Sequence, residues 1–320
     1  MWDKILYRLH SGKRVNAYYF ACQLLRSTVP DAWWRSRLSG ILQDAKRRSD
    51  YEYMLQRVDY YNKLTVPTQI HGATAIGKMR RQDYHSVYFY DTMKYARYFD
   101  AQRKIVMLDG DITHIPDCPT LLKSRPVGEE NENSVLLPLN EIRNFSYVID
   151  PVPWSRKRPL AVFRGDIIGK QKRIDLFERH FDNPLCDLGV SNRYPRHPQW
   201  VKGFMSIREQ LNYRYLIAIE GNDVASNLPW VMSSNTVAVM PRPQYETWFE
   251  QGRLIPDVHY LAVKSDYSDL SERIEYCQSH PDFAQYIIEN AHQWVAQFLD
   301  SERELAIALI VVKKYLDNTL

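Results

Sequence analysis

Short apolar runs alternate with amphipathic stretches through the middle of the chain. The apolar runs that predict strands cover residues 104–108, 134–137, 160–163, 215–219 and 236–240. Helical spacing lies between the later runs, over 174–181, 207–213 and 228–233. Strands of nearly continuous apolar residues that alternate with helices predict parallel sheets covered on both faces. The expected fold class is therefore α/β.

Both ends of the chain have a helical pattern. From Met1 to about Asp59, apolar residues such as Trp2, Ile5, Leu6 and Leu9 recur at three- and four-residue spacing. A helix-like stretch covers 92–99, and three more helices are predicted over 270–278, 283–298 and 301–316. Residues 150–159 hold three prolines and three basic residues, which is typical of a connection between domains. The chain length of 320 residues agrees with two domains.

The charge, the apolar runs and the cysteines of the chain limit the kinds of partner and cellular location that we expect. Charged residues make up 25% of the chain and the formal net charge is only +4, so a nucleic-acid partner is not indicated. We see no apolar run long enough to cross a bilayer and no signal-peptide pattern, so we expect a cytoplasmic protein. Lys4, Arg8, Lys13 and Arg14 permit contact with a membrane surface, although an ordinary amphipathic core helix explains them too. The four cysteines lie far apart and form no CxxC pair, which favours neither a zinc site nor a disulfide framework.

The end of the predicted strand at 160–163 carries the first candidate for ligand binding. In open α/β sheets, ligands bind where strands end and helix N-termini expose backbone donors. Here the sequence gives Phe163, Arg164, Gly165 and Asp166, followed at the start of a helix by Lys170, Lys172 and Arg173. Glycine lets a ligand approach the backbone, and guanidinium groups suit phosphate oxygens. A basic turn capped by Asp166 is the alternative interpretation.

The end of the strand at 215–219 carries the second candidate. Glu220 could accept hydrogen bonds from ribose hydroxyls, and the glycine-containing loop after it leads into a helix with Ser226 as the expected N-cap. Backbone amides there would favour a diphosphate. The loop residues are Gly221, Asn222, Asp223, Val224, Ala225, Ser226 and Asn227. Neither GxGxxG nor GxxxxGK[ST] occurs, which disfavours a dinucleotide fingerprint and a P-loop.

Asp109-Gly110-Asp111 is the third candidate, at the end of the run 104–108. From the residues alone, the two carboxylates could hold a divalent ion on a sugar diphosphate, or one of them could act as a general base. His114 and His259 have no metal-ligand partners at motif spacing, and GxSxG is missing, so neither a zinc enzyme nor a serine hydrolase is indicated.

Several of these segments together resemble glycosyltransferase family 90, in particular its bacterial lipopolysaccharide-core branch, which is related to the Rumi-type protein O-glucosyltransferases and the fungal capsule xylosyltransferases. The resemblance spans roughly residues 85–300. Its carriers are Phe163-Arg-Gly165 with Arg173, Glu220-Gly-Asn-Asp-Val-Ala-Ser-Asn227, Tyr245-Glu-Thr-Trp-Phe249, Leu254-Ile-Pro-Asp-Val-His-Tyr260, Ser268-Asp-Leu270, Lys123-Ser-Arg-Pro126 and Asn140-Glu-Ile-Arg-Asn-Phe145.

The resemblance implies a GT-B architecture, with two Rossmann-like domains facing a cleft. We therefore expect an acceptor-side domain over 1–155, a nucleotide-sugar domain over 156–300 and a C-terminal helix over 301–320 that crosses back to the first domain. It also implies an inverting transfer from a UDP-sugar without metal or other cofactor. The acceptor it implies is a lipopolysaccharide or lipooligosaccharide core at the cytoplasmic face of the inner membrane. A non-catalytic nucleotide-sugar or glycan-binding protein on the same fold is the alternative.

The resemblance also assigns roles to residues. In the eukaryotic relatives the base is an aspartate followed five residues later by proline, and Asp111 with Pro116 repeats that interval, so the resemblance favours Asp111 as the base. Arg173 falls near an arginine that contacts the diphosphate, with Lys172 as the alternative, and Ser226 matches a serine of the second nucleotide-binding loop. Two positions depart from the eukaryotic pattern. Asn227 stands near an arginine position and Asp166 replaces a serine.

Overall fold

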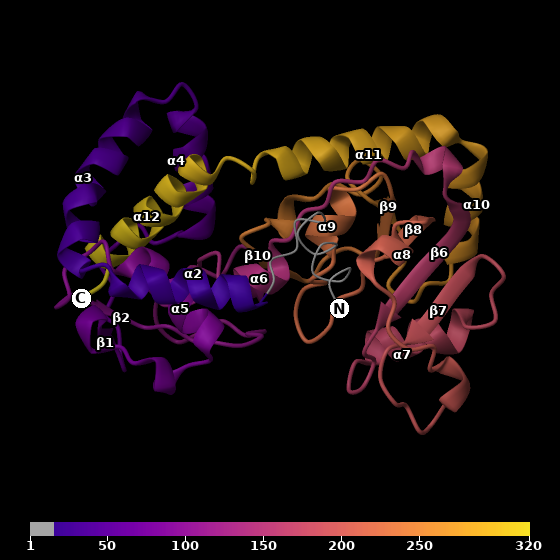
Figure 1. Cartoon of the computed structure of the whole chain (residues 1–320), viewed down its shortest axis with the longest axis horizontal. Helices are drawn as coiled ribbons and strands as arrows, with labels where there is room; N and C mark the ends of the chain where they lie inside the picture. Colours follow the sequence, from indigo (N-terminus) through magenta and orange to yellow (C-terminus); the bar gives the residue numbers. More distant parts are fainter. Residues whose placement is uncertain (1–15) are drawn as a thin grey trace. The chain divides into compact units, whose positions relative to one another are not determined.

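The computed structural model describes residues 16–320, which form two compact units (Figure 1). We call the first the sheet unit, made of 143–244 and 253–297, and the second the helical unit, made of 16–142, 245–252 and 298–320. The helix and the basic residues Lys4, Arg8, Lys13 and Arg14 expected in the first 15 positions lie outside the described residues.

The sheet unit contains a five-stranded parallel sheet in the order β11-β9-β8-β6-β7. The strands are β6 (Arg158–Gly165), β7 (Cys186–Val190), β8 (Tyr213–Ile217), β9 (Val237–Met240) and β11 (Leu261–Ala262). The helices of this unit are α7 (Gln171–His180), α8 (Ile207–Gln210), α9 (Leu228–Met232), α10 (Leu270–Ser279) and α11 (Pro281–Ala296), while α6 (Glu141–Asn144) lies at the boundary of the two units. Because the strands are parallel, all their carboxyl ends lie along one edge.

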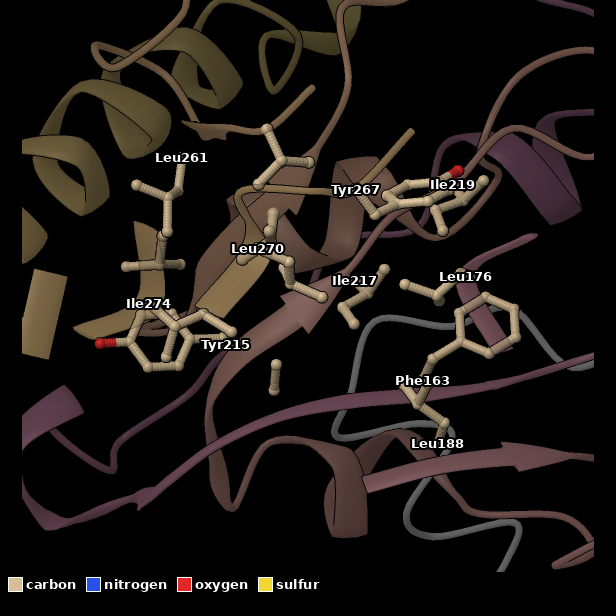
Figure 2. Close-up of a cluster of buried hydrophobic side chains, with 14 of the residues drawn as sticks. Phe163, Leu176, Leu188, Tyr215, Ile217, Ile219, Leu261, Tyr267, Leu270 and Ile274 are labelled. Atoms are coloured by element: carbon tan, nitrogen blue, oxygen red, sulfur yellow. The ribbon is translucent and has the colours of Figure 1, made fainter. Parts of the chain in front are cut away.

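The core of the sheet unit is built from strand and helix side chains of 0–8% exposure, several of them labelled in Figure 2. Phe163 and Leu188 come from the neighbouring strands β6 and β7, and Leu176 comes from α7. Tyr215 and Ile217 of β8 continue the same cluster toward Ile274 of α10 and Leu261 of β11. This continuous apolar packing fixes the strand ends that carry the candidate site.

The helical unit contains α2 (Asn16–Thr28), α3 (Asp31–Arg47), α4 (Tyr51–Tyr61), α5 (Ser86–Ala96) and α12 (Ser301–Asp317). Its strands form three pairs: β1 (Thr74–Ala75) with β2 (Lys104–Ile105), β4 (Ser124–Pro126) with β10 (Tyr245–Thr247), and β3 (Thr120–Leu122) with β5 (Ser134–Leu136). Helix α12 packs on α3, α4 and α5 (Figure 1).

A buried ionic cluster ties the separate chain segments of the helical unit together. The Arg57 side chain is fully buried in α4, and it pairs with Glu250 at 2.9 Å and with Glu304 of α12. Arg125 of β4 pairs at 2.8 Å with Glu246 of β10. A fully buried charge is tolerated only when it is paired with an opposite charge. The ion pairs to Glu246 and Glu250 therefore hold the 245–252 segment in place.

The α/β class predicted from the alternating pattern is confirmed, and its parallel sheet lies in the sheet unit. The helix expected over 207–213 ends at Gln210, because β8 already begins at Tyr213. The run 104–108 forms only β2 and a single bridge from Met107 to Leu121 of β3. The described strands of the helical unit are two or three residues long and form only two-stranded sheets, so they do not build a second sheet like that of the sheet unit. The domain boundaries expected from the sequence stay a prediction.

Candidate functional site

The order of strands in the parallel sheet reverses between β6 and β8. From β6 the chain continues to β7 on one side, and it then returns to β8 on the other side before continuing to β9 and β11. The carboxyl ends of β6 and β8 flank this topological switch point, where open α/β sheets bind their ligands. The loops that follow these two strands begin at Asp166 and at Ala218, and they include both candidate regions predicted for the donor diphosphate.

Arg173, in the first turn of α7, joins these two loops. Its guanidinium donates hydrogen bonds to the backbone oxygen of Asp166 at 2.7 Å, of Ile219 at 2.9 Å and of Glu220 at 3.2 Å. The close approach depends on a glycine, because a Cβ on Gly221 would lie 3.1 Å from an Arg173 nitrogen. A single cation is therefore held at the switch point by carbonyl groups of both loops.

The charge of Arg173 is not balanced by a direct carboxylate contact. Among the described residues, no Asp or Glu oxygen lies within 4.0 Å of its guanidinium nitrogens. Burial lowers the pKa of Arg173. Asp166 opposes this effect, and the neighbouring Arg143 adds to it. A partly desolvated cation with only carbonyl partners is suited to bind an anion from solution.

The neighbouring lysines are paired with carboxylates. Lys170 contacts Asp166 at 2.6 Å, and Lys172 contacts Glu220 at 2.6 Å and the side-chain oxygen of Gln244 at 2.6 Å. Burial acts to raise the pKa of Asp166, but hydrogen bonds from Lys170 and a backbone amide outweigh it and lower that pKa. Of the two alternatives from the sequence, Lys172 has a carboxylate partner, whereas Arg173 has none within ion-pair distance among the described residues.

Phe163 and Arg164 precede the first loop on β6. Phe163 is 5% exposed and packs edge-on against Phe177, and the Arg173 guanidinium lies 5.6 Å from its ring centre. Arg164 pairs with Asp187 of β7 at 2.7 Å and donates to two backbone oxygens. These contacts give both side chains a role in holding β6 beside β7 and α7, and a donor contact for either one stays a prediction.

The second loop runs from Glu220 into α9. One Glu220 oxygen accepts from Lys172 and the other accepts from the backbone amide of Gln244 at 2.7 Å. The expectation that Ser226 caps the following helix is wrong: Asn227 occupies the cap position, and no side-chain hydrogen bond caps the helix. Helix α9 has only five residues, so its dipole supplies little of the field expected there. Asp223, Val224 and Ala225 are buried in the loop, Asn222 is exposed, and Gly221 and Ser226 are intermediate.

The candidate base lies in the helical unit, in a loop after the bridge at Met107. Asp111 forms an ion pair at 2.5 Å with Lys123, whose side chain is 3% exposed and follows directly on β3. Asp109 instead accepts from the backbone amide and the ring nitrogen of His85, both at 2.6 Å. The two carboxylates are thus oriented by different partners. Gly110 between them has φ +100°, a conformation that glycine adopts readily.

The described part of the chain has neither a cluster of metal ligands nor a helix suited to cross a membrane. In residues 16–320 no group of three or more His, Cys, Asp and Glu side chains is arranged to hold a metal ion. Over the same range, no helix has the length and apolar character needed to span a membrane.

Sequence reasoning missed several residues of this region. Gln244, which contacts both Lys172 and Glu220, follows β9 at the same edge of the sheet, and this position after a strand was a usable signal. Lys123 was noted only as part of a family motif, because nothing local shows that it pairs with a carboxylate twelve positions earlier. Asp187, the partner of Arg164, lies on a strand that the sequence did not predict.

A cation at the switch point of a parallel sheet is an arrangement that open α/β proteins use to bind anionic or phosphorylated ligands. Comparison with known proteins identifies the class: residues 140–317 match the model of glycosyl transferase family 90. The chain is 37% identical over 318 residues to O-glucosyltransferase LpsA of Dichelobacter nodosus, covering 98% of both proteins. The chain therefore belongs to glycosyltransferase family 90, as its motifs predicted, and it is a glycosyltransferase.

More distant relatives match smaller parts. Protein O-glucosyltransferase 3 of Homo sapiens is 24% identical over 171 residues, which cover 52% of this chain and 33% of that protein. Uncharacterized protein 179R of Invertebrate iridescent virus 6 is 24% identical over 243 residues, which cover 62% of this chain and 20% of that protein. The similarity to the Rumi-type branch expected from the sequence is thus present at lower identity.

Proposed function

We propose that this glycosyltransferase moves a hexose or pentose from a UDP-sugar to a hydroxyl of a lipopolysaccharide or lipooligosaccharide core glycan. The transfer inverts the anomeric centre and uses no metal ion. Glucose is the sugar to test first, because the relative from Dichelobacter nodosus is named an O-glucosyltransferase. The proposal includes the GT-B architecture and a location at the cytoplasmic face of the inner membrane.

The observation that carries the proposal is Arg173 at the switch point. It lies where the loops after β6 and β8 meet, and no carboxylate of the described chain pairs with it. A diphosphate would supply the missing negative charge. When the bond from the sugar to the diphosphate breaks, negative charge grows on the departing oxygen, and a fixed guanidinium stabilises it.

Asp111 is the proposed base. Its carboxylate takes the proton from the acceptor hydroxyl while the hydroxyl oxygen attacks the anomeric carbon, and the electron pair of the broken bond leaves with UDP. Lys123 holds one oxygen of this carboxylate and so fixes its direction. Because Asp109 and Asp111 are held by different partners, His85 and Lys123, the base role suits Asp111 better than a shared metal site does.

A donor screen with UDP-glucose, UDP-galactose, UDP-xylose and UDP-N-acetylhexosamines tests the proposal, with purified core oligosaccharide as the acceptor and UDP release as the signal. Asp111→Asn should abolish transfer but keep UDP binding in calorimetry. Near-normal turnover of this variant would refute the base assignment. Activity that is lost in EDTA and restored by manganese would refute the metal-free mechanism.

The donor site is tested separately by binding. Arg173→Met should weaken UDP binding by about tenfold or more, because a charged hydrogen-bonding group is worth about 1.5–3 kcal/mol. Arg179→Met is the matched control on the same helix, since Arg179 has a half-exposed side chain. Equal UDP affinity in both variants would exclude Arg173 as the diphosphate contact. UDP binding without transfer from any donor would instead indicate a non-catalytic nucleotide-sugar-binding protein.

A further inference from the structure

Helix α2 packs into the helical unit through a polar face. Tyr19 and Gln23 are its buried residues, at 2% and 4% exposure. The Tyr19 hydroxyl donates to Asp91 of α5 at 2.5 Å, and the Arg26 carbonyl accepts from Arg97 at 2.7 Å. A helix on a protein surface normally buries its apolar stripe, so this arrangement is reversed.

The outward face of α2 is apolar. Tyr18 is 62% exposed, Phe20 39%, Leu24 63% and Leu25 68%. At 3.6 residues per turn, these four side chains lie on one continuous arc of roughly 160°. The remaining members of the arc are small and exposed: Ala17, Ala21 and Thr28. A contiguous apolar surface of this kind marks an interaction site.

The charged residues of α2 and of most of α3 are mainly basic. From position 16 to position 43 the only acidic residue is Asp31, and it is paired with Arg97 at 2.8 Å. Arg35 and Arg37 of α3 are both exposed, and the Arg37 guanidinium lies 4.9 Å from the ring centre of Trp33, which is itself 45% exposed. Apolar side chains, an exposed tryptophan and unopposed arginines are the composition of a surface that lies in a membrane interface.

We propose that α2 and the first turns of α3 form a docking surface for a membrane that contains anionic phospholipids. An anionic headgroup layer complements the arginines, and the acyl boundary accepts the apolar arc. A second copy of the chain fits less well, because in a symmetric contact this segment would meet itself, and its one acidic residue, Asp31, is already paired with Arg97. The surface contains no residue of the donor loops and does not include Asp111. It deepens the proposed location at a membrane and rests on that part of the proposed function, whereas the donor screen tests the transfer reaction separately.

Sedimentation of the full chain with vesicles tests this surface. Binding should be strong to phosphatidylcholine vesicles containing phosphatidylglycerol and weak to phosphatidylcholine alone. Leu24→Ser with Leu25→Ser should reduce the partition coefficient at least tenfold, because each leucine loses most of its apolar transfer energy. The matched control is Val66→Ser with Leu299→Ser, two residues of the same unit that are 63% and 57% exposed.

The electrostatic part is tested with Arg35→Gln and Arg37→Gln. Each change should weaken binding to the anionic vesicles about fivefold, with little effect on neutral vesicles. Lys46→Gln with Arg47→Gln, at the other end of α3, is the control for net charge.

Three results would overturn the proposal. The first is equal loss of vesicle binding in the leucine variant and its control, or no vesicle binding by the natural chain. The second is a concentration-dependent dimer that the leucine changes abolish in analytical ultracentrifugation, which assigns the face to a second copy. The third is a large fall in Tm of the leucine variant, which means that the chain itself covers this face.

Discussion

Asp91 of α5 makes the stability of the helical unit depend on pH. Its carboxyl group is fully buried and accepts from the Tyr19 hydroxyl and from the backbone amide of Glu141 at 3.0 Å. Burial and, after it, the nearby Glu141 carboxylate raise the pKa of Asp91 to about 7, although the hydrogen bonds from Tyr19 and the Glu141 amide and the charge of Lys94 oppose the rise. The native state therefore keeps this proton to a higher pH than the unfolded chain does.

The direction and size of the effect follow from the two pKa values. The unfolded chain releases the proton near its ordinary pKa of 3.8, and the native state releases it near 7, so stability falls as pH rises between these values. At about 1.4 kcal/mol for each pH unit, the full cost is about 4 kcal/mol, of which about 3 kcal/mol falls between pH 5 and pH 8.

Asp91→Asn should remove this dependence. An asparagine can accept from the Glu141 amide and donate to the Tyr19 oxygen, as a protonated carboxyl group does. The free energy of unfolding of Asp91→Asn minus that of the natural chain should be about 3 kcal/mol larger at pH 8 than at pH 5. Urea unfolding followed by circular dichroism at both pH values measures this gain. Asp44→Asn is the control, because Asp44 is 77% exposed. A free-energy difference between natural chain and Asp91→Asn that is equal at both pH values would refute the reasoning.

Three further changes probe the site and the core. Lys123→Met should lower kcat at least tenfold with a smaller change in donor KM, and Lys123→Arg should recover part of the rate, because the cation orients the candidate base. Gly221→Ala should raise the Kd for UDP severalfold in calorimetry at unchanged Tm, since its new Cβ would lie 3.1 Å from Arg173 and displace the guanidinium slightly. Arg57→Met should cost about 3–5 kcal/mol in urea unfolding by leaving a buried carboxylate unpaired, whereas Arg47→Met, in an exposed pair, should cost less than about 1 kcal/mol.

The strands that could be predicted were those with a continuous apolar run. Val237–Met240 and Tyr213–Ile217 carry such runs and form β9 and β8. Strand β7 was missed because Asp187 and Gly189 interrupt its pattern as a turn would. Gly189 is required by a tertiary contact, because a Cβ at this position would lie 2.7 Å from the Lys202 Cβ. Such a contact involves a residue distant in the sequence, so no local pattern reveals it.

The candidate site was predicted as two loops, and the structure separates the roles of their cations. The residue types alone made Arg164, Lys172 and Arg173 all candidates for a phosphate contact, and only the family resemblance named Arg173 with Lys172 as the alternative. Their partners differ: Asp187 pairs with Arg164 and Glu220 pairs with Lys172, while the hydrogen bonds of Arg173 within residues 16–320 go to backbone carbonyl groups. Which cation is available to a ligand depends on these tertiary pairs, whose members are 23 to 48 positions apart.

The division of the helical unit among three chain segments has a consequence for synthesis of the protein. Helix α12 and β10 complete this unit, and they come much later in the chain than α2 to α5. As the chain leaves the ribosome, Arg57 of α4 is exposed long before Glu250 and Glu304 exist to neutralise it. We therefore expect the early helices to stay incompletely packed until nearly the whole chain has been translated. A fragment that stops after residue 244 would lack α12 and β10, so the faces of α3, α4 and α5 that α12 covers would stay exposed. We expect such a fragment to be a substrate for chaperones and proteases.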